Sequence, residues 1–229
     1  IKNQINEVLA NRMENYVGHI EDFDLSLWRG AYQIQGLELR ERNSKAPRPL
    51  LRIDEIDISV SWRALFKGMI LADLIFFKPT IIVSDSEDEQ TKQDAGENAN
   101  WAEIFQRLIP FRLASIRVND GGVQLENLDS LKAPVLLNLT QIEIVATNIH
   151  NLQDEKKTLY SKLSATAKLQ DQADLWLAGT FDLNRSFDFD AKLDRIPLVA
   201  LNPFFKAYGP FDANKGTLEI YAELALEKS

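Results

Sequence analysis

The sequence contains no cysteine among its 229 residues, so disulfides, thiol chemistry and cysteine-bound zinc are excluded. Histidine is scarce, and His19 and His150 lie too far apart in the chain to suggest a metal site or a Ser-His-Asp triad. No run approaches about 18 apolar residues, so no segment is predicted to cross a bilayer. Basic residues number 26 against 34 acidic ones, and the net charge of −8 argues against nucleic acid as a partner. We therefore expect no enzyme, no cofactor and no metal.

Apolar residues nevertheless make up 45% of the chain, enough for a sizeable core, and most of them alternate with polar residues. Helical spacing is confined to 2–16, 100–108 and 197–208, with one further helical turn at 62–68. Strands are predicted at 23–28, 32–39, 51–62, 70–77, 80–84, 111–119, 122–128, 134–147, 158–170, 173–184, 186–194 and 211–226. Gly36 is interpreted as a bulge, and Gly121-Gly122 as a hairpin turn.

The segment 84–100 differs from the rest in composition, with six acidic residues against one lysine and almost no apolar side chain. Such a segment gains too little from burial to offset the entropy of ordering, so a mobile acidic loop is predicted. Its carboxylates lack the glycine-centred ligand spacing of known calcium loops.

The later strands alternate strictly, which gives each of them one polar and one apolar face, as is common in antiparallel sheets. The predicted helices are too few to cover so many apolar faces. We therefore expect a single domain over 1–229, mainly β, whose sheet either folds on itself as a closed sandwich or curves into an apolar groove. Periodicity alone leaves both alternatives open.

Several local sequences favour the groove. They are Tyr16-Val17-Gly18, residues 23–30 (FDLSLWRG), 31–39 (AYQIQGLEL), 53–68 (IDEIDISVSWRALFKG), Lys78-Pro79, 120–122 (DGG) and 207–216 (AYGPFDANKG). In this order and spacing they resemble an uncharacterised branch of the AsmA-like proteins of Gram-negative envelopes, over nearly the whole chain. The opening is also similar to the chorein-type N-terminus of bridge-like lipid-transfer proteins. The acidic insert is not part of the family pattern.

The resemblance implies a long, strongly curved antiparallel sheet whose apolar concave face holds the acyl chains of a phospholipid or another lipid. It also implies a periplasmic body, tethered by an inner-membrane helix that precedes the domain; we expect the chain to be a fragment of such a protein. The N-terminal amphipathic helix would cap one end through Ile5, Leu9 and Met13. The candidate lipid-binding residues are Leu163, Leu175, Leu177, Phe181, Phe187, Phe189, Leu193, Leu218 and Ile220.

Two other functions are alternatives to lipid transfer. A structural module, with the sheet closed as a sandwich, would dock a protein partner in the envelope. A hydrolase with a carboxylate pair such as Asp188 and Asp190 ranks far below, because strand alternation explains those residues more simply. If the groove exists, its N-terminal end should be capped by the helix, and the strand near 217–224 should form an open edge.

Overall fold

The computed structural model describes residues 1–11, 16–26, 30–42, 49–66, 71–85, 112–127, 135–149, 160–182 and 186–226. These residues form a mainly β protein built on one long sheet, which confirms the predicted fold class. The strands are β1 (Tyr16–His19), β2 (Asp22–Ser26), β3 (Ala31–Glu41), β4 (Leu51–Val60), β5 (Leu71–Phe77), β6 (Thr80–Asp85), β7 (Arg112–Asn127), β8 (Val135–Thr147), β9 (Ser161–Leu169), β10 (Ala173–Phe181), β11 (Phe187–Pro197) and β12 (Thr217–Leu226).

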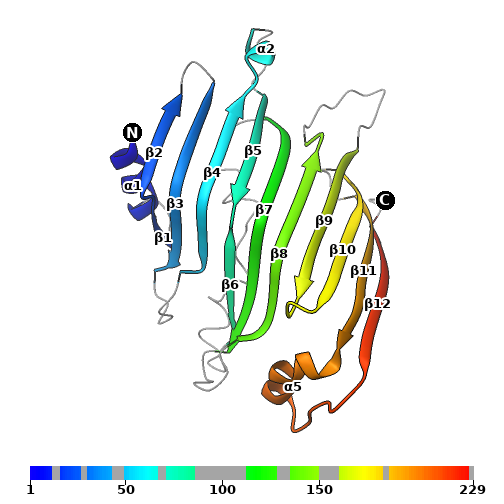
Figure 1. The fold of residues 1–229 in the computed structure, drawn as a ribbon. Coiled ribbons are helices and arrows are strands. Elements are labelled where there is room, and N and C mark those ends of the chain that lie inside the picture. The colour runs from blue at the N-terminus through cyan, green and yellow to red at the C-terminus, as the bar shows by residue number, and fades with distance from the viewer. Residues whose placement is uncertain are drawn as a thin grey trace.

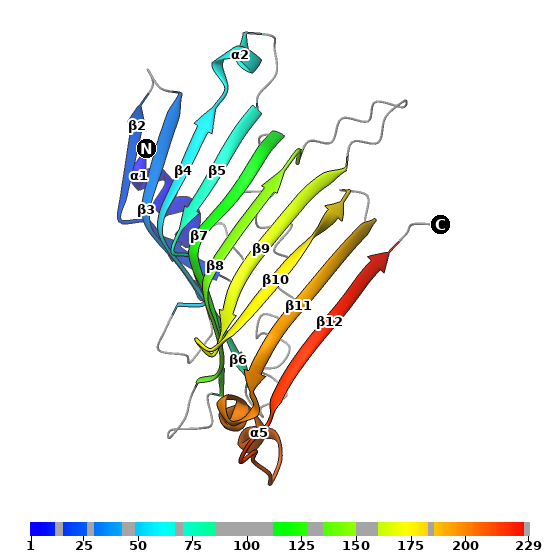
Figure 2. The same ribbon diagram turned by 45° about the vertical axis from the view of Figure 1, so that its right-hand side comes forward.

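The described strands occupy ten positions in an open order, with β1 and β2 at one edge and β12 at the other (Figures 1 and 2). β1 and β2 pair with β3 in one continuous register, and β5 and β6 do the same against β4. No second sheet is present in the described part of the chain, so the closed sandwich is wrong.

One junction departs from the antiparallel pattern that we predicted. β7 runs parallel to both β5 and β6, and every other described pair is antiparallel. A parallel neighbour requires the chain to return along the sheet, and residues 86–111 make this connection. Most of the predicted acidic loop at 84–100, and all of the predicted helix at 100–108, lie there, outside the described residues.

The helices lie at the periphery of the sheet, α1 (Lys2–Asn11) beside its first strands and α2 (Trp62–Leu65) and α5 (Asn202–Tyr208) at opposite ends of the strands (Figure 1). α1 is shorter than the predicted helix over 2–16, because Tyr16 already pairs with Glu41 in the β1–β3 ladder. α2 is the single helical turn expected after β4, and it projects beyond the strand ends (Figure 1). The predicted helix at 197–208 consists of a 3₁₀ turn, η2 (Leu198–Leu201), followed by α5.

The sheet bends along a line that crosses neighbouring strands at one level, and this line is called the crease below. In β3 and β4 the side-chain phase changes between Ile34 and Leu37 and between Ile53 and Ile56, while the register of the two strands stays unbroken. No residue is therefore inserted at Gly36, and the predicted bulge is wrong. Both strands change phase together, which the left-handed backbone of Gly36 (φ 61°) permits.

β7 continues through Gly121 and Gly122, so the hairpin predicted at these glycines is wrong. The two glycines lie on the same crease. The strand shifts register against β8 on either side of Gly121, next to a left-handed Asp120 (φ 54°). The peptide N–H of Gly122 donates to the carbonyl of Pro79 at 2.8 Å, where β5 ends and β6 begins. β7 thus kinks to follow the interruption in its parallel neighbour instead of reversing.

Two clusters of buried side chains pack on the sheet. The larger lies under α1, where Leu9 and Ile5 pack against residues of β3, β4 and β5. The smaller lies under η2 and α5, where Leu201 and Phe205 pack against Ile196 and residues of β8 to β12. Ile5 and Leu9, two of the three residues predicted to cap the groove, thus pack on the sheet, and the third, Met13, lies outside the described residues.

Candidate functional site

Cross-strand pairing aligns apolar residues into rows that cross the whole sheet on one face. The first row, from β2 to β12, is Leu25, Tyr32, Ile58, Leu74, Ile116, Ala146, Leu163, Gly179, Phe189 and Leu224. The second is Phe23, Ile34, Ile56, Phe76, Val118, Ile144, Ala165, Leu177, Ala191 and Ala222. Every member is a direct partner of the next, and neither row contains a charged residue.

A third row continues this face on the other side of the crease. Its members are Gly18, Leu39, Leu51, Ile81, Val123, Leu139, Leu169 and Ala173. If the strands alternated strictly through the crease, the apolar side chains of the third row would point to the face opposite the first two rows. The change of phase at the crease therefore keeps all three rows on one face. The three rows together are called the apolar face below.

Cover over the apolar face is most complete at β4 and β5 and decreases from there toward β12. In the first row Ile58 and Leu74 are buried, whereas Leu163 and Phe189 are half-buried and Leu224 on β12 is 48% exposed. The first member, Leu25 on β2, is itself 41% exposed, and Ala146 on β8 is buried. In the second row Ile56 and Phe76 are buried and every member from Val118 onward is only half-buried. The face is therefore closed at β4 and β5 and, apart from Ala146, incompletely covered from β7 to β12.

The nine candidate residues predicted from the sequence lie on four adjacent strands, and most belong to this incompletely covered part. Leu163 and Phe189 are in the first row and Leu177 is in the second. Phe181 and Phe187 pair directly, and the Phe187 and Phe189 rings stack at 5.7 Å. These five side chains form one aromatic and aliphatic surface.

The other four candidates lie nearer to α5. Leu175, Leu193 and Ile220 are direct partners, and Leu218 is opposite Ile196 beyond a shift of register. Leu193 is buried, and Leu175 and Leu218 pack into the smaller cluster under η2 and α5. This end is a closed core, so the exposed Ile220 is the only one of the four that faces solvent.

The polar face of the same strands carries the charges. Asp188 and Asp190 are exposed on β11, and Asp190 pairs across the ladder with Glu223 of β12. Lys168 on β9 binds Asp174 on β10 at 2.7 Å. Among the described residues, no group of three or more histidine or acidic side chains could hold a metal ion. The arrangement provides an apolar surface on one side and a hydrated acidic surface on the other.

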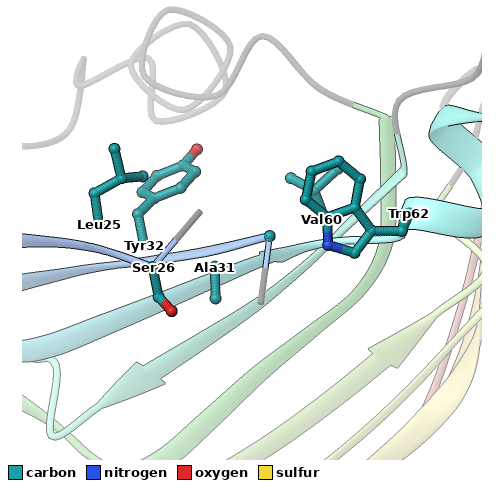
Figure 3. A pocket seen from close by; sticks show the side chains of 7 residues that line it. Leu25, Ser26, Ala31, Tyr32, Val60 and Trp62 are labelled. Carbon is teal, nitrogen blue, oxygen red and sulfur yellow. The ribbon is translucent and has the colours of Figure 1, made fainter. Parts of the chain in front are cut away.

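A pocket of about 210 Å³ opens at the α2 end of the apolar face (Figure 3). The pocket is lined by Leu25 and Ser26 of β2, by Gly30, Ala31 and Tyr32, by Val60 of β4 and by Trp62 of α2. Two of these residues, Leu25 and Tyr32, begin the first row. Burial among apolar groups raises the pKa of the Tyr32 hydroxyl above its ordinary value, as expected for a site with little water.

The tight packing of the pocket depends on Gly30, which has a left-handed backbone (φ 62°). A Cβ atom at this position would lie 2.8 Å from Nε1 of Trp62 and 3.1 Å from the Val60 carbonyl oxygen. The indole can therefore lie against the backbone of β3 only because a side chain is missing there.

Sequence reasoning missed the first half of the rows and the pocket. Alternation gives the apolar side of each strand, but Leu25, Tyr32 and Ile116 become neighbours of the predicted residues only through the register. The parallel junction between β5 and β7 joins the two halves, and no local signal in the sequence indicated it.

Comparison with known protein families finds no family model that matches the chain, and comparison with characterised proteins finds no match either. None of the described helices combines the length and hydrophobicity needed to span a bilayer.

Proposed function

We propose that this chain is a non-enzymatic lipid-binding module that holds acyl chains along its apolar face. The observation that carries the proposal is the pair of uncharged rows, buried at β4 and β5 and, apart from Ala146, half-buried or exposed from β7 to β12. Contiguous exposed apolar surface in a protein generally marks a binding site, and an acyl chain needs continuous hydrocarbon contact without polar partners.

The resemblance to AsmA-like proteins supports an envelope setting for this activity. In that setting the domain lies in the periplasm, follows an inner-membrane anchor, and accepts phospholipid or another acyl-chain lipid. In such a groove, α1 would close the N-terminal end and acyl chains would enter through the incompletely covered part. The unpaired edge of β12 would allow further strands to lengthen the groove.

The proposal is tested by asking whether the purified protein carries lipid. Native mass spectrometry should detect bound lipid of discrete mass, and solvent extraction should recover it. A second measurement is the binding of an NBD-labelled phospholipid, which becomes fluorescent in an apolar site.

Phe189→Glu places a carboxylate on the first row, where desolvation and loss of hydrocarbon contact oppose acyl binding. The matched control is Thr180→Glu, on the opposite face of β10, where its cross-strand neighbours are Lys162 on β9 and Asp188 on β11. We expect Phe189→Glu to reduce lipid retention at least tenfold with a small loss of stability, and the control to retain lipid. Equal losses of retention and stability in Phe189→Glu would instead indicate a closed core.

An interaction module is the second candidate function, and one observation favours it. β12 has no second strand partner among the described residues, and Ile220, Leu224 and Leu226 of this strand are exposed. An envelope protein could add a strand there. Native mass spectrometry separates the two: a protein free of lipid that binds a strand-forming partner would support docking and contradict lipid binding.

A further inference from the structure

The tip formed by α2 and Phe66 has a surface unlike the rest of this acidic protein. Phe66 is 87% exposed and Trp62 is 43% exposed, and their rings lie 6.3 Å apart. The sequence from 61 to 72 contains Arg63 and Lys67 but no acidic residue, in a chain with a net charge of −8. The tip therefore combines aromatic side chains with local positive charge, and it projects beyond the ends of the strands (Figures 1 and 2).

The tip is continuous with the apolar face. Trp62 forms one wall of the 210 Å³ pocket, and Leu25 and Tyr32, at its other side, are the first two members of the first row. A hydrocarbon chain that enters beside Trp62 would thus meet the pocket lining, which contains no charged residue (Figure 3).

The exposed aromatic groups around α5 and on β12 do not share these properties. Around α5, Phe204 contacts Tyr208, Phe205 contacts Phe211, and Phe205 also packs into the smaller buried cluster. Tyr221 on β12 lies on the polar face, near Glu219 and Lys192. Phe66, at 87%, is more exposed than any of these rings, and its ring partner, Trp62, is part of the same tip.

We propose that the tip binds the surface of an anionic lipid bilayer, with Trp62 and Phe66 inserted at the interface and Arg63 beside the lipid phosphates. Tryptophan is favoured at the boundary of headgroups and hydrocarbon, and each basic side chain close to an anionic surface strengthens binding about fivefold. The acidic polar face is repelled by the same surface, so the molecule stands on its α2 end. The pocket then becomes the entrance for an acyl chain; this last step rests on the proposed function.

The test is co-sedimentation of the protein with vesicles of phosphatidylglycerol and phosphatidylcholine, compared with vesicles of phosphatidylcholine alone. We expect stronger binding to the anionic vesicles, decreasing as salt is added. Phe66→Ser and Arg63→Glu should each weaken binding at least fivefold. The controls are Tyr221→Ser, which removes an exposed ring from β12, and Lys215→Glu, which makes the same charge change in the segment that follows α5; both should bind as the unmodified protein does.

Three results with vesicles would overturn the tip proposal: no binding to anionic vesicles, equal binding by Phe66→Ser, or equal binding to neutral vesicles. A tip that instead proves necessary for capture of a defined envelope protein would also overturn it. Retention of NBD-labelled phospholipid by the isolated protein is measured in parallel, and Phe66→Ser should leave it unchanged. Vesicle binding that depends on the tip, without lipid retention, would support the tip proposal and contradict the proposed lipid-binding function. Lipid retention without vesicle binding would support the lipid-binding function and contradict the tip proposal.

Discussion

Leucine-to-alanine substitutions at the two ends of the apolar face measure how completely each end is covered. Leu74 on β5 is fully buried, and Leu177 on β10 is half-buried between Ala165 and Ala191. Each substitution removes three carbons, which at about 0.8 kcal/mol each correspond to about 2.4 kcal/mol of transfer free energy for a fully buried side chain. A cavity left at Leu74 raises the total, since fully buried leucines typically lose about 2–5 kcal/mol.

At Leu177 we expect a smaller loss, about 1.5 kcal/mol, because the side chain is only partly buried and solvent can fill the space that alanine leaves. The free energy of unfolding is measured by urea denaturation of lipid-free protein, with the slope m unchanged in both variants. Losses within about 0.5 kcal/mol of each other would refute an open C-terminal half, since that equality requires comparable burial at both sites.

Three further predictions concern the N-terminal half. Asn6→Ala should lower the free energy of unfolding by about 1–3 kcal/mol in a urea titration, because the Asn6 amide binds both the N–H (2.7 Å) and the C=O (3.2 Å) of Ile20 at the interruption between β1 and β2. Gly30→Ala should lower the melting temperature and reduce binding of NBD-labelled phospholipid, since its Cβ would displace Trp62 from the pocket wall; unchanged binding would contradict the geometry. The raised pKa of Tyr32 favours its neutral form in the folded state, so stability is complete below the ordinary pKa near 10 and falls as the pH rises above it. Tyr32→Phe should therefore lose less stability than the unmodified protein between pH 9 and 11, and an equal loss would exclude Tyr32 as a cause.

The sequence by itself determined the class of fold and the sidedness of its strands. Alternation is a local property: in an extended chain, successive side chains must point to opposite faces. The strict pattern in β9, β10 and β11 therefore placed Leu163, Leu177 and Phe189 on the apolar side of their own strands. The helical spacing of Ile5 and Leu9 likewise predicted the cap.

Tertiary structure decided which strands are neighbours and how the sheet bends. The run Asp120-Gly121-Gly122 is typical of a hairpin turn, yet β7 continues through it, because the interruption at Pro79 in the parallel strand supplies a partner for Gly122. Local preference for a turn was outweighed by pairing with a segment about 40 residues away, which the sequence pattern of neither strand reveals.

The rows of the apolar face depend on the same long-range register. A shift of one residue in any strand would turn its apolar side chains to the polar face, so each row exists only because every pair of strands is in its particular alignment. Leu25 and Leu224 stand about 200 positions apart and still belong to one row. Alternation determined that each strand has an apolar side, whereas the registers of all the strand pairs together decided that these sides form one continuous surface, open from β7 to β12.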